Sequence, residues 1–138
     1  MRVVIDTNVL VSGMLSPHGP PGRIVDAVLA KGLAVVYDDR ILGEYRAVLR
    51  RPRFGFRPQD VDAFLDFVEL SGEPAVGLLL TVVLPDPSDL PFLEVAAGGR
   101  ADALITGNAK HFRPRRGSHR VLVCTPAEFV HLTGAGDP

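Results

Sequence analysis

Four polar side chains follow apolar runs of the sequence, close to where each run ends. Asp6 comes directly after RVVI, and Asn108 comes shortly after ADALIT. Asp86 and Asp89 follow the run VGLLLTVVLP. Carboxylates are hard oxygen ligands that suit Mg²⁺ or Mn²⁺. A cation held by several of them can activate a water molecule that hydrolyses a phosphodiester bond. These residues are therefore candidates for metal-dependent hydrolysis, provided that the fold brings them together.

Each of these residues also has an ordinary structural explanation. An aspartate that follows a strand commonly caps the next helix, and Asp6 stands in such a position. Asp86 and Asp89 belong to the segment DPSD, which is typical of a turn followed by a helix start. Asn108 follows a glycine, and both residues are common in turns. For any one of them, a structural and a chemical role remain open.

Glu44 is a fifth candidate, in the middle of the segment ILGEYRAVLRR. On a helix it shares one stripe with the apolar residues Ile41 and Val48, rather than with the arginines around it. A glutamate at the edge of a helix, with its stem along the apolar surface, also explains this pattern. The coincidence of five such residues favours a shared site over five separate structural roles.

The apolar runs predict strands that alternate with helices. Strands are expected at residues 2–6, 33–37, 76–84, 101–106 and 120–124. Helices are expected at 23–32, 39–51, 58–72, over LPFLEVAAGG, and after the capping-box pattern TPAE, with a loop at 16–22. Such alternation predicts a largely parallel sheet covered on both faces. Active sites of open α/β sheets lie at the carboxyl ends of the strands, where most of these candidates fall.

Length and composition are those of an ordinary globular protein. The chain has 138 residues, of which 46% are hydrophobic and 22% charged. This predicts one domain over residues 1–132, followed by a short flexible tail at 133–138. The single cysteine, Cys124, lies in an apolar run and is expected to be a buried thiol in a reducing cytoplasm. No apolar run is long enough to cross a bilayer, and no secretory signal pattern is present, so no membrane association is expected.

Basic residues are concentrated in two segments. Residues 40–57 contain six arginines and one acid, and residues 110–120 contain five basic residues and no acid. Such clusters suit the phosphate backbone of a nucleic acid, although a charged face is often only solvated. The residues predicted to bind such a backbone are Arg50, Arg51, Arg53 and Lys110.

Taken together, these segments resemble the PIN domain family. The resemblance rests on VVIDTNVLVSG, ILGEYRAVLRRPRF, DPSDLPFLEVAAGGRADALITGN and TPAEF, and it extends from Val3 to about Phe129. The sequence is most similar to the branch of toxin components of toxin–antitoxin systems, which are related to VapC-type ribonucleases. The resemblance implies a three-layer α/β/α sandwich with a mostly parallel sheet. It also implies a ribonuclease that needs Mg²⁺ or Mn²⁺, forms homodimers and pairs with a small antitoxin protein.

The resemblance also assigns roles by position. The matching metal ligands and catalytic acids are Asp6, Glu44 and Asp89. Asp86 matches a further acid of this branch, as Asp102 does, whereas Asn8 and Thr106 match polar positions that orient the acids. Asn108 stands where many PIN domains carry a fourth aspartate, so this catalytic position offers an amide in place of a charge. The departure keeps open a PIN-fold module of weakened activity that binds RNA or a protein.

Other enzyme classes lack their essential residues. A phosphatase of the haloacid dehalogenase type needs a second acid two residues after the first-strand aspartate, where this chain has Asn8. A nucleotide-binding fold needs a glycine-rich turn after its first strand, and DTNVLVSG does not supply one. The four histidines do not have the spacing of metal ligands. With these classes excluded, the function that the resemblance to PIN domains implies is that of a metal-dependent endoribonuclease.

Overall fold

The computed structural model describes residues 1–134 of the chain. Its strands are β1 (Arg2–Ile5), β2 (Ala34–Tyr37), β3 (Glu73–Pro74), β4 (Ala103–Ile105) and β5 (Val123–Cys124). Its α-helices are α1 (Thr7–Leu15), α2 (Pro20–Leu29), α3 (Asp39–Leu49), α4 (Pro58–Ser71), α5 (Leu90–Gly98) and α6 (Pro126–Thr133). Three short 3₁₀ helices are η1 (Pro52–Phe54), η2 (Pro87–Asp89) and η3 (Ala109–Phe112).

The five strands form one parallel sheet in the order β3-β2-β1-β4-β5. β1 is at the centre, where Val3 pairs with Val35 on one side and Ala103 on the other. Val3, Val4 and Ile5 are completely buried, because a central parallel strand is covered on both faces. All strands run in the same direction, so their carboxyl ends meet at one edge of the sheet.

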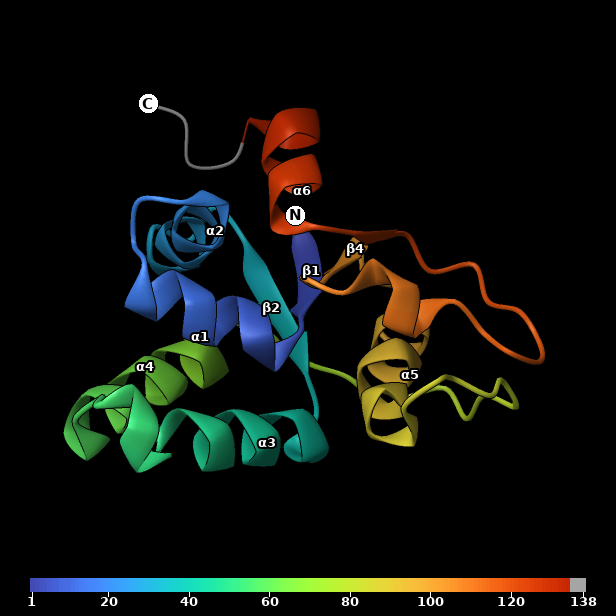
Figure 1. Cartoon of the computed structure of the whole chain (residues 1–138), viewed down its shortest axis with the longest axis horizontal. Coiled ribbons are helices and arrows are strands. Elements are labelled where there is room, and N and C mark those ends of the chain that lie inside the picture. Colours follow the sequence, from blue (N-terminus) through green and yellow to red (C-terminus); the bar gives the residue numbers. More distant parts are fainter. Residues whose placement is uncertain (135–138) are drawn as a thin grey trace.

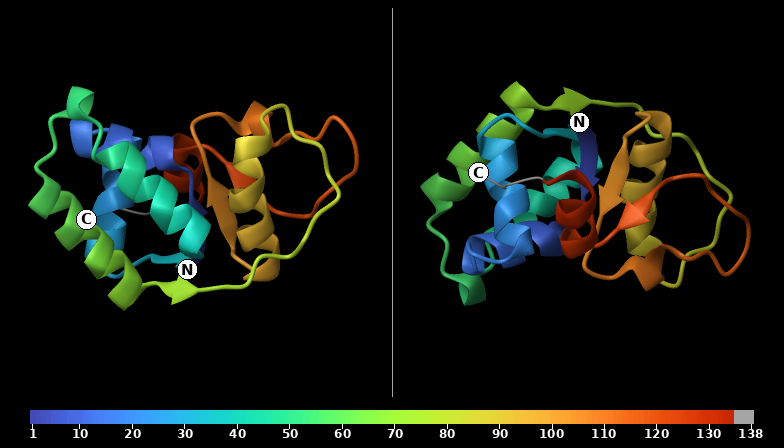
Figure 2. Two further views of the ribbon diagram at one scale, coloured as in Figure 1. Left: turned by 90° about the horizontal axis from the view of Figure 1, so that it is seen from below. Right: turned by 90° about the horizontal axis from the view of Figure 1, so that it is seen from above.

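Helices cover both faces of this sheet (Figure 1). α2 packs against α1 and α6 on one face, while α5 packs against β1, β2 and β4 on the other. α3 contacts β2 and α5, and α4 lies against α3 and β2. The views in Figure 2 show α6 and α5 on opposite sides of the strands. The predicted three-layer α/β/α fold with a parallel sheet is confirmed.

The predicted strand at 76–84 is wrong. This segment runs over α5 as an extended connection and, within the described chain, joins only one isolated antiparallel bridge, between Val83 and Arg116. Val76 and Leu79 are each 88% exposed, whereas Val82 and Leu84 are buried. The apolar run suggests a strand, but the position beside β2 is taken by the two-residue β3, which the sequence pattern does not predict.

Several element ends also differ from the prediction. α2 begins at Pro20 rather than residue 23, because prolines are well accommodated in the first turn of a helix. It ends at Leu29, and Lys31 takes the left-handed conformation expected of a residue after a helix.

The capping box before α6 is confirmed, with Thr125 and Glu128 bonded reciprocally. Thr133, the first residue of the predicted tail, is the last of α6, and residues 135–138 lie outside the described residues.

No helix within residues 1–134 is long and apolar enough to cross a membrane. Cys124 is buried in β5, as expected from its apolar surroundings.

Tyr45 connects α3 to both the central strand and α5. Its hydroxyl donates a hydrogen bond to the carbonyl oxygen of Ile5, the last residue of β1. Its ring lies 6.4 Å from that of Phe92 in α5. Burial raises the pKa of Tyr45 well above its usual value, so the hydroxyl stays protonated and acts as a donor. The residue next to Glu44 is therefore fixed by contacts with both β1 and α5.

Replacing Tyr45 by phenylalanine removes this donor and leaves a carbonyl in the core without one of its partners. We expect the Tyr45→Phe protein to lose about 1–2 kcal/mol of unfolding free energy, measured by urea denaturation. Tyr37→Phe is the matched control, since that hydroxyl donates to the carbonyl of Glu69, an exposed residue. A loss in Tyr45→Phe no greater than in the control would contradict the assigned role.

Candidate functional site

A cleft of about 340 Å³ opens at the carboxyl edge of the sheet. It lies where β1 passes into α1, beside the middle of α3 and the start of α5. We call it the acidic cleft, because it is lined by four carboxylates. The residues that line it are Asp6, Thr7, Asn8, Glu44, Val48, Arg51, Arg53, Phe54, Asp86, Ser88, Asp89 and His111.

Asp6 is a buried acid held by a neighbouring strand end. It occupies the N-cap position of α1, but its side chain makes no capping hydrogen bond there. Instead Oδ2 accepts a hydrogen bond of 2.7 Å from the hydroxyl of Thr106, which follows β4 and is completely buried. Burial raises the pKa of Asp6, while the Thr106 hydrogen bond and the N–H groups of Thr7 and Asn8 oppose that rise.

Glu44 is half-buried and is held from α1. Thr7, the residue after Asp6, donates its hydroxyl to Oε2 of Glu44. This contact joins the first residue of α1 to the middle of α3. Threonine hydroxyls thus orient both acids, but only the Thr106 contact corresponds to a role given by the sequence resemblance. The Thr7–Glu44 contact depends on how α1 and α3 cross, and the sequence contains no signal for it.

Asp89 is the acid with the most unusual environment. Its Oδ2 atom is buried and has no hydrogen-bond partner among residues 1–134, although Nδ1 of His111 lies 3.7 Å away. Burial, and then repulsion from Asp6 and Asp86, raise the pKa of Asp89 to about 6, while His111 opposes the rise. Its side chain does not cap α5. An unpaired buried carboxylate oxygen that faces other acids is an electrostatic environment that a cation would relieve.

Asp86 behaves differently. It is exposed and accepts hydrogen bonds from both the N–H and the hydroxyl of Ser88, at 2.9 and 2.8 Å. These bonds lower the pKa of Asp86. The turn interpretation therefore applies to Asp86 but not to Asp89, and Asp86 also lines the rim of the cleft.

The acids line the same cleft, but they do not form a preorganised metal site. Among the described residues, no group of three or more His, Cys, Asp or Glu side chains is arranged to hold one metal ion. The structure thus brings the predicted carboxylates into one cavity, but the arrangement of ligands around an ion does not pre-exist in it.

Asn108 does not line the cleft. It is exposed at the start of η3, and its backbone N–H donates to the hydroxyl of Thr106 at 3.1 Å. His111, one turn further along, contributes the side chain from this part of the chain. The histidines lack a ligand pattern in the sequence, so this role of His111 was missed. Its position three residues after Asn108 was the only signal available for it.

The predicted RNA-binding residues separate into two groups. Arg51 and Arg53 line the acidic cleft, together with Phe54, whose ring lies 4.8 Å from the Arg53 guanidinium. Arg50 instead pairs with Asp62 of α4. Lys110 is exposed on η3, next to His111 but not among the residues that line the cleft. The cleft is thus acidic at its base and has two arginines at its border.

Asp102 lies at the opposite edge of the sheet. It directly precedes β4 and accepts a hydrogen bond of 2.8 Å from the N–H of Arg2, at the start of β1. A parallel sheet separates the two ends of its strands, so Asp102 cannot join the acids of the cleft. The sequence resemblance alone did not distinguish its position from that of Asp86.

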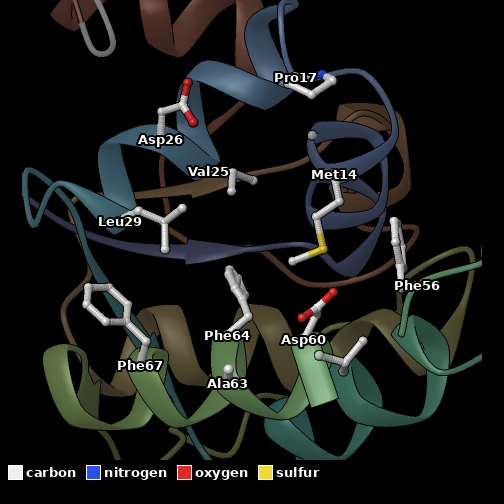
Figure 3. Close-up of a pocket in the computed structure, with 12 residues that line it drawn as sticks. Met14, Pro17, Val25, Asp26, Leu29, Phe56, Asp60, Ala63, Phe64 and Phe67 are labelled. Atoms are coloured by element: carbon white, nitrogen blue, oxygen red, sulfur yellow. The ribbon is translucent and has the colours of Figure 1, made fainter. Parts of the chain in front are cut away.

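A larger cleft of about 540 Å³ lies elsewhere, between α4 and the pair α1 and α2 (Figure 3). Phe64 and Phe67 of α4 point into it and face Leu29 of α2 and Met14 of α1. None of the acids from the strand ends lines this cleft. Asp26 and Asp60 also line it, but its other walls are mainly apolar. The acidic cleft gathers four carboxylates at the carboxyl edge of the sheet, so it is the candidate site despite its smaller volume.

The raised pKa of Asp89 predicts a pH-dependent stability. The pKa of Asp89 is about 6 in the folded protein, above its usual value of 3.8, so protonated Asp89 favours the folded state. This contribution to the free energy of unfolding is present below pH 4 and is lost as pH rises through 6. Asp89→Asn, which stays neutral, should be stabilised relative to the wild type at pH 7 but not at pH 4, measured by thermal unfolding.

Asp86→Asn is the matched control for this measurement. The pKa of Asp86 is lowered, so its contribution has the opposite sign: it is present at neutral pH and is lost in acid. Equal behaviour of the two variants at pH 7 would contradict the electrostatic description of the cleft.

Comparison with known proteins agrees with this arrangement. The family model described as PIN domain matches residues 2–110. An uncharacterized protein of the archaeon Methanocaldococcus jannaschii is 27% identical over 143 aligned residues, which cover 94% of this chain and 90% of the relative. No solved structure gives a significant match. Because the family model covers most of the chain, including all four carboxylates of the acidic cleft, the chain belongs to the PIN domain family.

Proposed function

We propose that the chain is a metal-dependent endoribonuclease that hydrolyses RNA phosphodiester bonds in the acidic cleft. Members of the PIN domain family are generally metal-dependent nucleases, and the chain has the fold of that family. The observation that carries the proposal is Asp89, whose buried Oδ2 has no hydrogen-bond partner among the described residues while three further carboxylates line the same cavity. A divalent cation would neutralise this repulsion and satisfy that oxygen.

The donor set suits Mg²⁺ or Mn²⁺. Asp6, Glu44 and Asp89 would hold the ion, with Asp86 at the rim as a further ligand, since carboxylate oxygens are the ligands that both ions prefer. The bound ion would supply an activated water and neutralise charge on the phosphodiester. Because the acids are not yet arranged around one point, binding of the ion and ordering of the ligands are coupled.

The chain's own residues orient these groups. Thr106 fixes Asp6 and Thr7 fixes Glu44, and each of these hydrogen bonds uses only one oxygen of the acid. Asn8, exposed at the start of α1, would contact the substrate or the acids from the rim. Arg51 and Arg53 would bind the phosphates, and Lys110 would extend the basic border on the η3 side.

The biological role is also part of the proposal. By its resemblance to toxin components, the chain would act in the cytoplasm as a homodimer and would be inhibited by a small antitoxin protein. Sedimentation that shows only monomers at high protein concentration would refute the dimer. Failure to bind the product of a small neighbouring reading frame would refute the antitoxin partnership.

One observation favours a second candidate function. Asn108 carries no charge and stays outside the cleft, so the site lacks an acid that many PIN domains have. A weakened PIN-fold module that binds RNA or a protein without cleaving it remains the alternative. Cleavage assays on matched variants separate the two functions.

Asp6→Asn should reduce RNA cleavage by about 100-fold or more, because it removes the most buried ligand charge. The measurement is cleavage of labelled single-stranded and structured RNAs in Mn²⁺, in Mg²⁺ and in a chelator. Asp102→Asn is the matched control, since Asp102 lies at the opposite sheet edge, and it should retain wild-type activity. Equal inactivity of wild type and Asp6→Asn, without Mn²⁺ binding, would favour the binding module.

Replacing both Arg51 and Arg53 by glutamine should weaken RNA binding and reduce its salt dependence. For a single strand, the slope of log K against log salt should become shallower by about 0.7 for each phosphate that the protein no longer neutralises. Binding is measured by fluorescence anisotropy in a chelator, so that no cleavage occurs. Arg50→Gln is the control, because Arg50 is already paired with Asp62. A slope that changes equally in both proteins would refute the assignment of the cleft arginines.

A further inference from the structure

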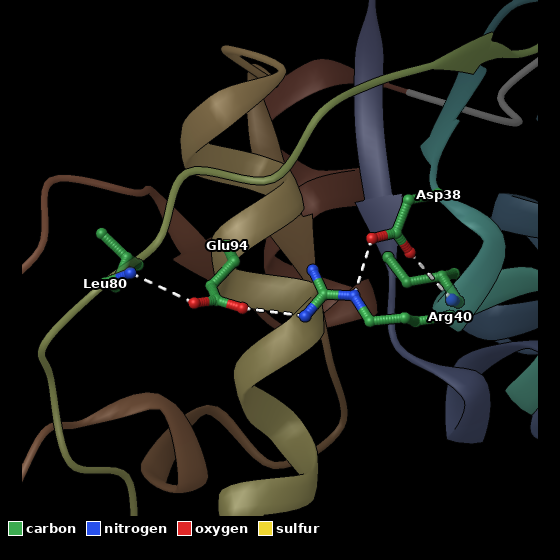
Figure 4. Close-up of polar contacts among 5 residues, drawn as sticks. Asp38, Arg40, Leu80 and Glu94 are labelled. Atoms are coloured by element: carbon green, nitrogen blue, oxygen red, sulfur yellow. Dashed lines mark hydrogen bonds and ion pairs between the residues drawn. The ribbon is translucent and has the colours of Figure 1, made fainter.

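Glu94 is a buried carboxylate that lies outside the acidic cleft. It is 4% exposed and its neighbours along α5, from Phe92 to Ala96, are buried apolar residues. Both oxygens are paired: Oε1 accepts from Nη1 of Arg40 at 2.9 Å, and Oε2 accepts from the N–H of Leu80 at 3.1 Å (Figure 4). Only the carboxylate of this ion pair is buried, because the Arg40 side chain is 48% exposed.

Arg40 is itself fixed at the start of α3. Its Nε donates to Oδ2 of Asp38 at 2.8 Å, while Oδ1 of Asp38 caps α3 by accepting from the N–H of Ile41 at 3.0 Å. The guanidinium therefore lies between the N-terminus of α3 and the middle of α5 (Figure 4). The Arg40–Glu94 ion pair joins two helices that are separate in sequence.

The same glutamate also holds the segment that leads to η2. The N–H of Leu78 donates to the backbone carbonyl of Glu94 at 2.9 Å, in addition to the Leu80 contact. Gly77 passes so close that a Cβ atom there would lie 2.9 Å from Nη2 of Arg40. Residues 77–80 thus run directly over the ion pair, a few residues before Asp86.

The joined helices are those that carry two of the proposed metal ligands. Glu44 is four residues after Arg40 on α3, about 6 Å along the helix. Asp89 is five residues before Glu94, at the start of α5. A change in the separation of α3 and α5 at the ion pair would therefore change the separation of these two acids in the cleft.

We propose that Glu94 is a positioning residue, which through Arg40 sets the spacing of α3 and α5 from which Glu44 and Asp89 close around one divalent cation. This inference rests on the proposed function. The contacts of Glu94 reach the elements that carry Glu44, Asp86 and Asp89, although Glu94 itself lines no part of the acidic cleft.

Glu94→Gln is the first test. Glutamine can still accept from Leu80 but loses the charge that pairs with Arg40. We expect Mn²⁺ affinity, measured by calorimetry, to fall about tenfold. RNA affinity in a chelator should stay unchanged, and excess Mn²⁺ should restore the cleavage rate, neither of which a general loss of structure would produce.

Arg40→Met tests the same ion pair from the other side. The Arg40 side chain is 48% exposed, and the Glu94 carboxylate keeps its hydrogen bond from the N–H of Leu80, so this variant is the second test if Glu94→Gln does not fold. Its Mn²⁺ affinity should fall by the same factor, and the double variant should be no weaker than either single one, because both changes remove one interaction.

Asp62→Asn is the matched control, because it removes an ion pair that joins α3 to α4 instead of α5. Its Mn²⁺ affinity should equal that of the wild type. Folded Glu94→Gln or Arg40→Met protein with wild-type Mn²⁺ affinity would overturn the inference while leaving the proposed function intact. A wild-type protein that binds no Mn²⁺ would overturn both.

Discussion

The parallel alignment of five strands is the constraint on which the rest of this structure depends. It buries β1 on both faces and brings the carboxyl ends of β1, β2 and β4 to one edge. Asp6 follows the central strand directly, so its carboxylate is withdrawn from water whatever its role. Burial is the main cause of the raised pKa of both Asp6 and Asp89, and at Asp89 repulsion from the nearby acids adds to it.

Around this edge, two of the acids are held by elements other than their own. Thr106, after β4, holds Asp6, while Thr7, at the start of α1, holds Glu44. Tyr45 connects α3 to β1 through a backbone carbonyl and to α5 through Phe92. Charges that repel one another are therefore kept close by hydrogen bonds and core packing. Asp89 differs from the others because its Oδ2 lacks such a partner among the described residues.

The charge of the cleft is affected by Asn108, which stands where many PIN domains carry an aspartate. Asparagine at position 108 takes no part in lining the cleft, and its backbone N–H supports Thr106 instead. His111 faces Asp89 from the same stretch of chain and partly offsets the repulsion among the acids. The chain thus has four carboxylates in the cleft, all of them carried by the β1–α1 junction, α3 and the segment before α5.

The sequence by itself determined the fold class and the places where the acids leave the apolar runs. Its alternation of strands and helices requires a covered parallel sheet, and residues at strand ends must then share an edge. Periodicity could not determine the course of 76–84, because an apolar run is compatible with a strand and with a segment packed on a helix. The resemblance to PIN domains matched both Asp86 and Asp102 to acids of this branch, and only the fold places Asp86 at the acidic cleft and Asp102 at the opposite edge of the sheet.

Only the tertiary structure decided the partners of each side chain. The contacts of Thr7 with Glu44 and of Arg40 with Glu94 join residues 37 and 54 positions apart. Such contacts depend on how α1, α3 and α5 cross, which is set by the packing of large buried side chains and not by local pattern. The sequence thus determined which acids reach the sheet edge, and the packing of the helices decided how they are held there.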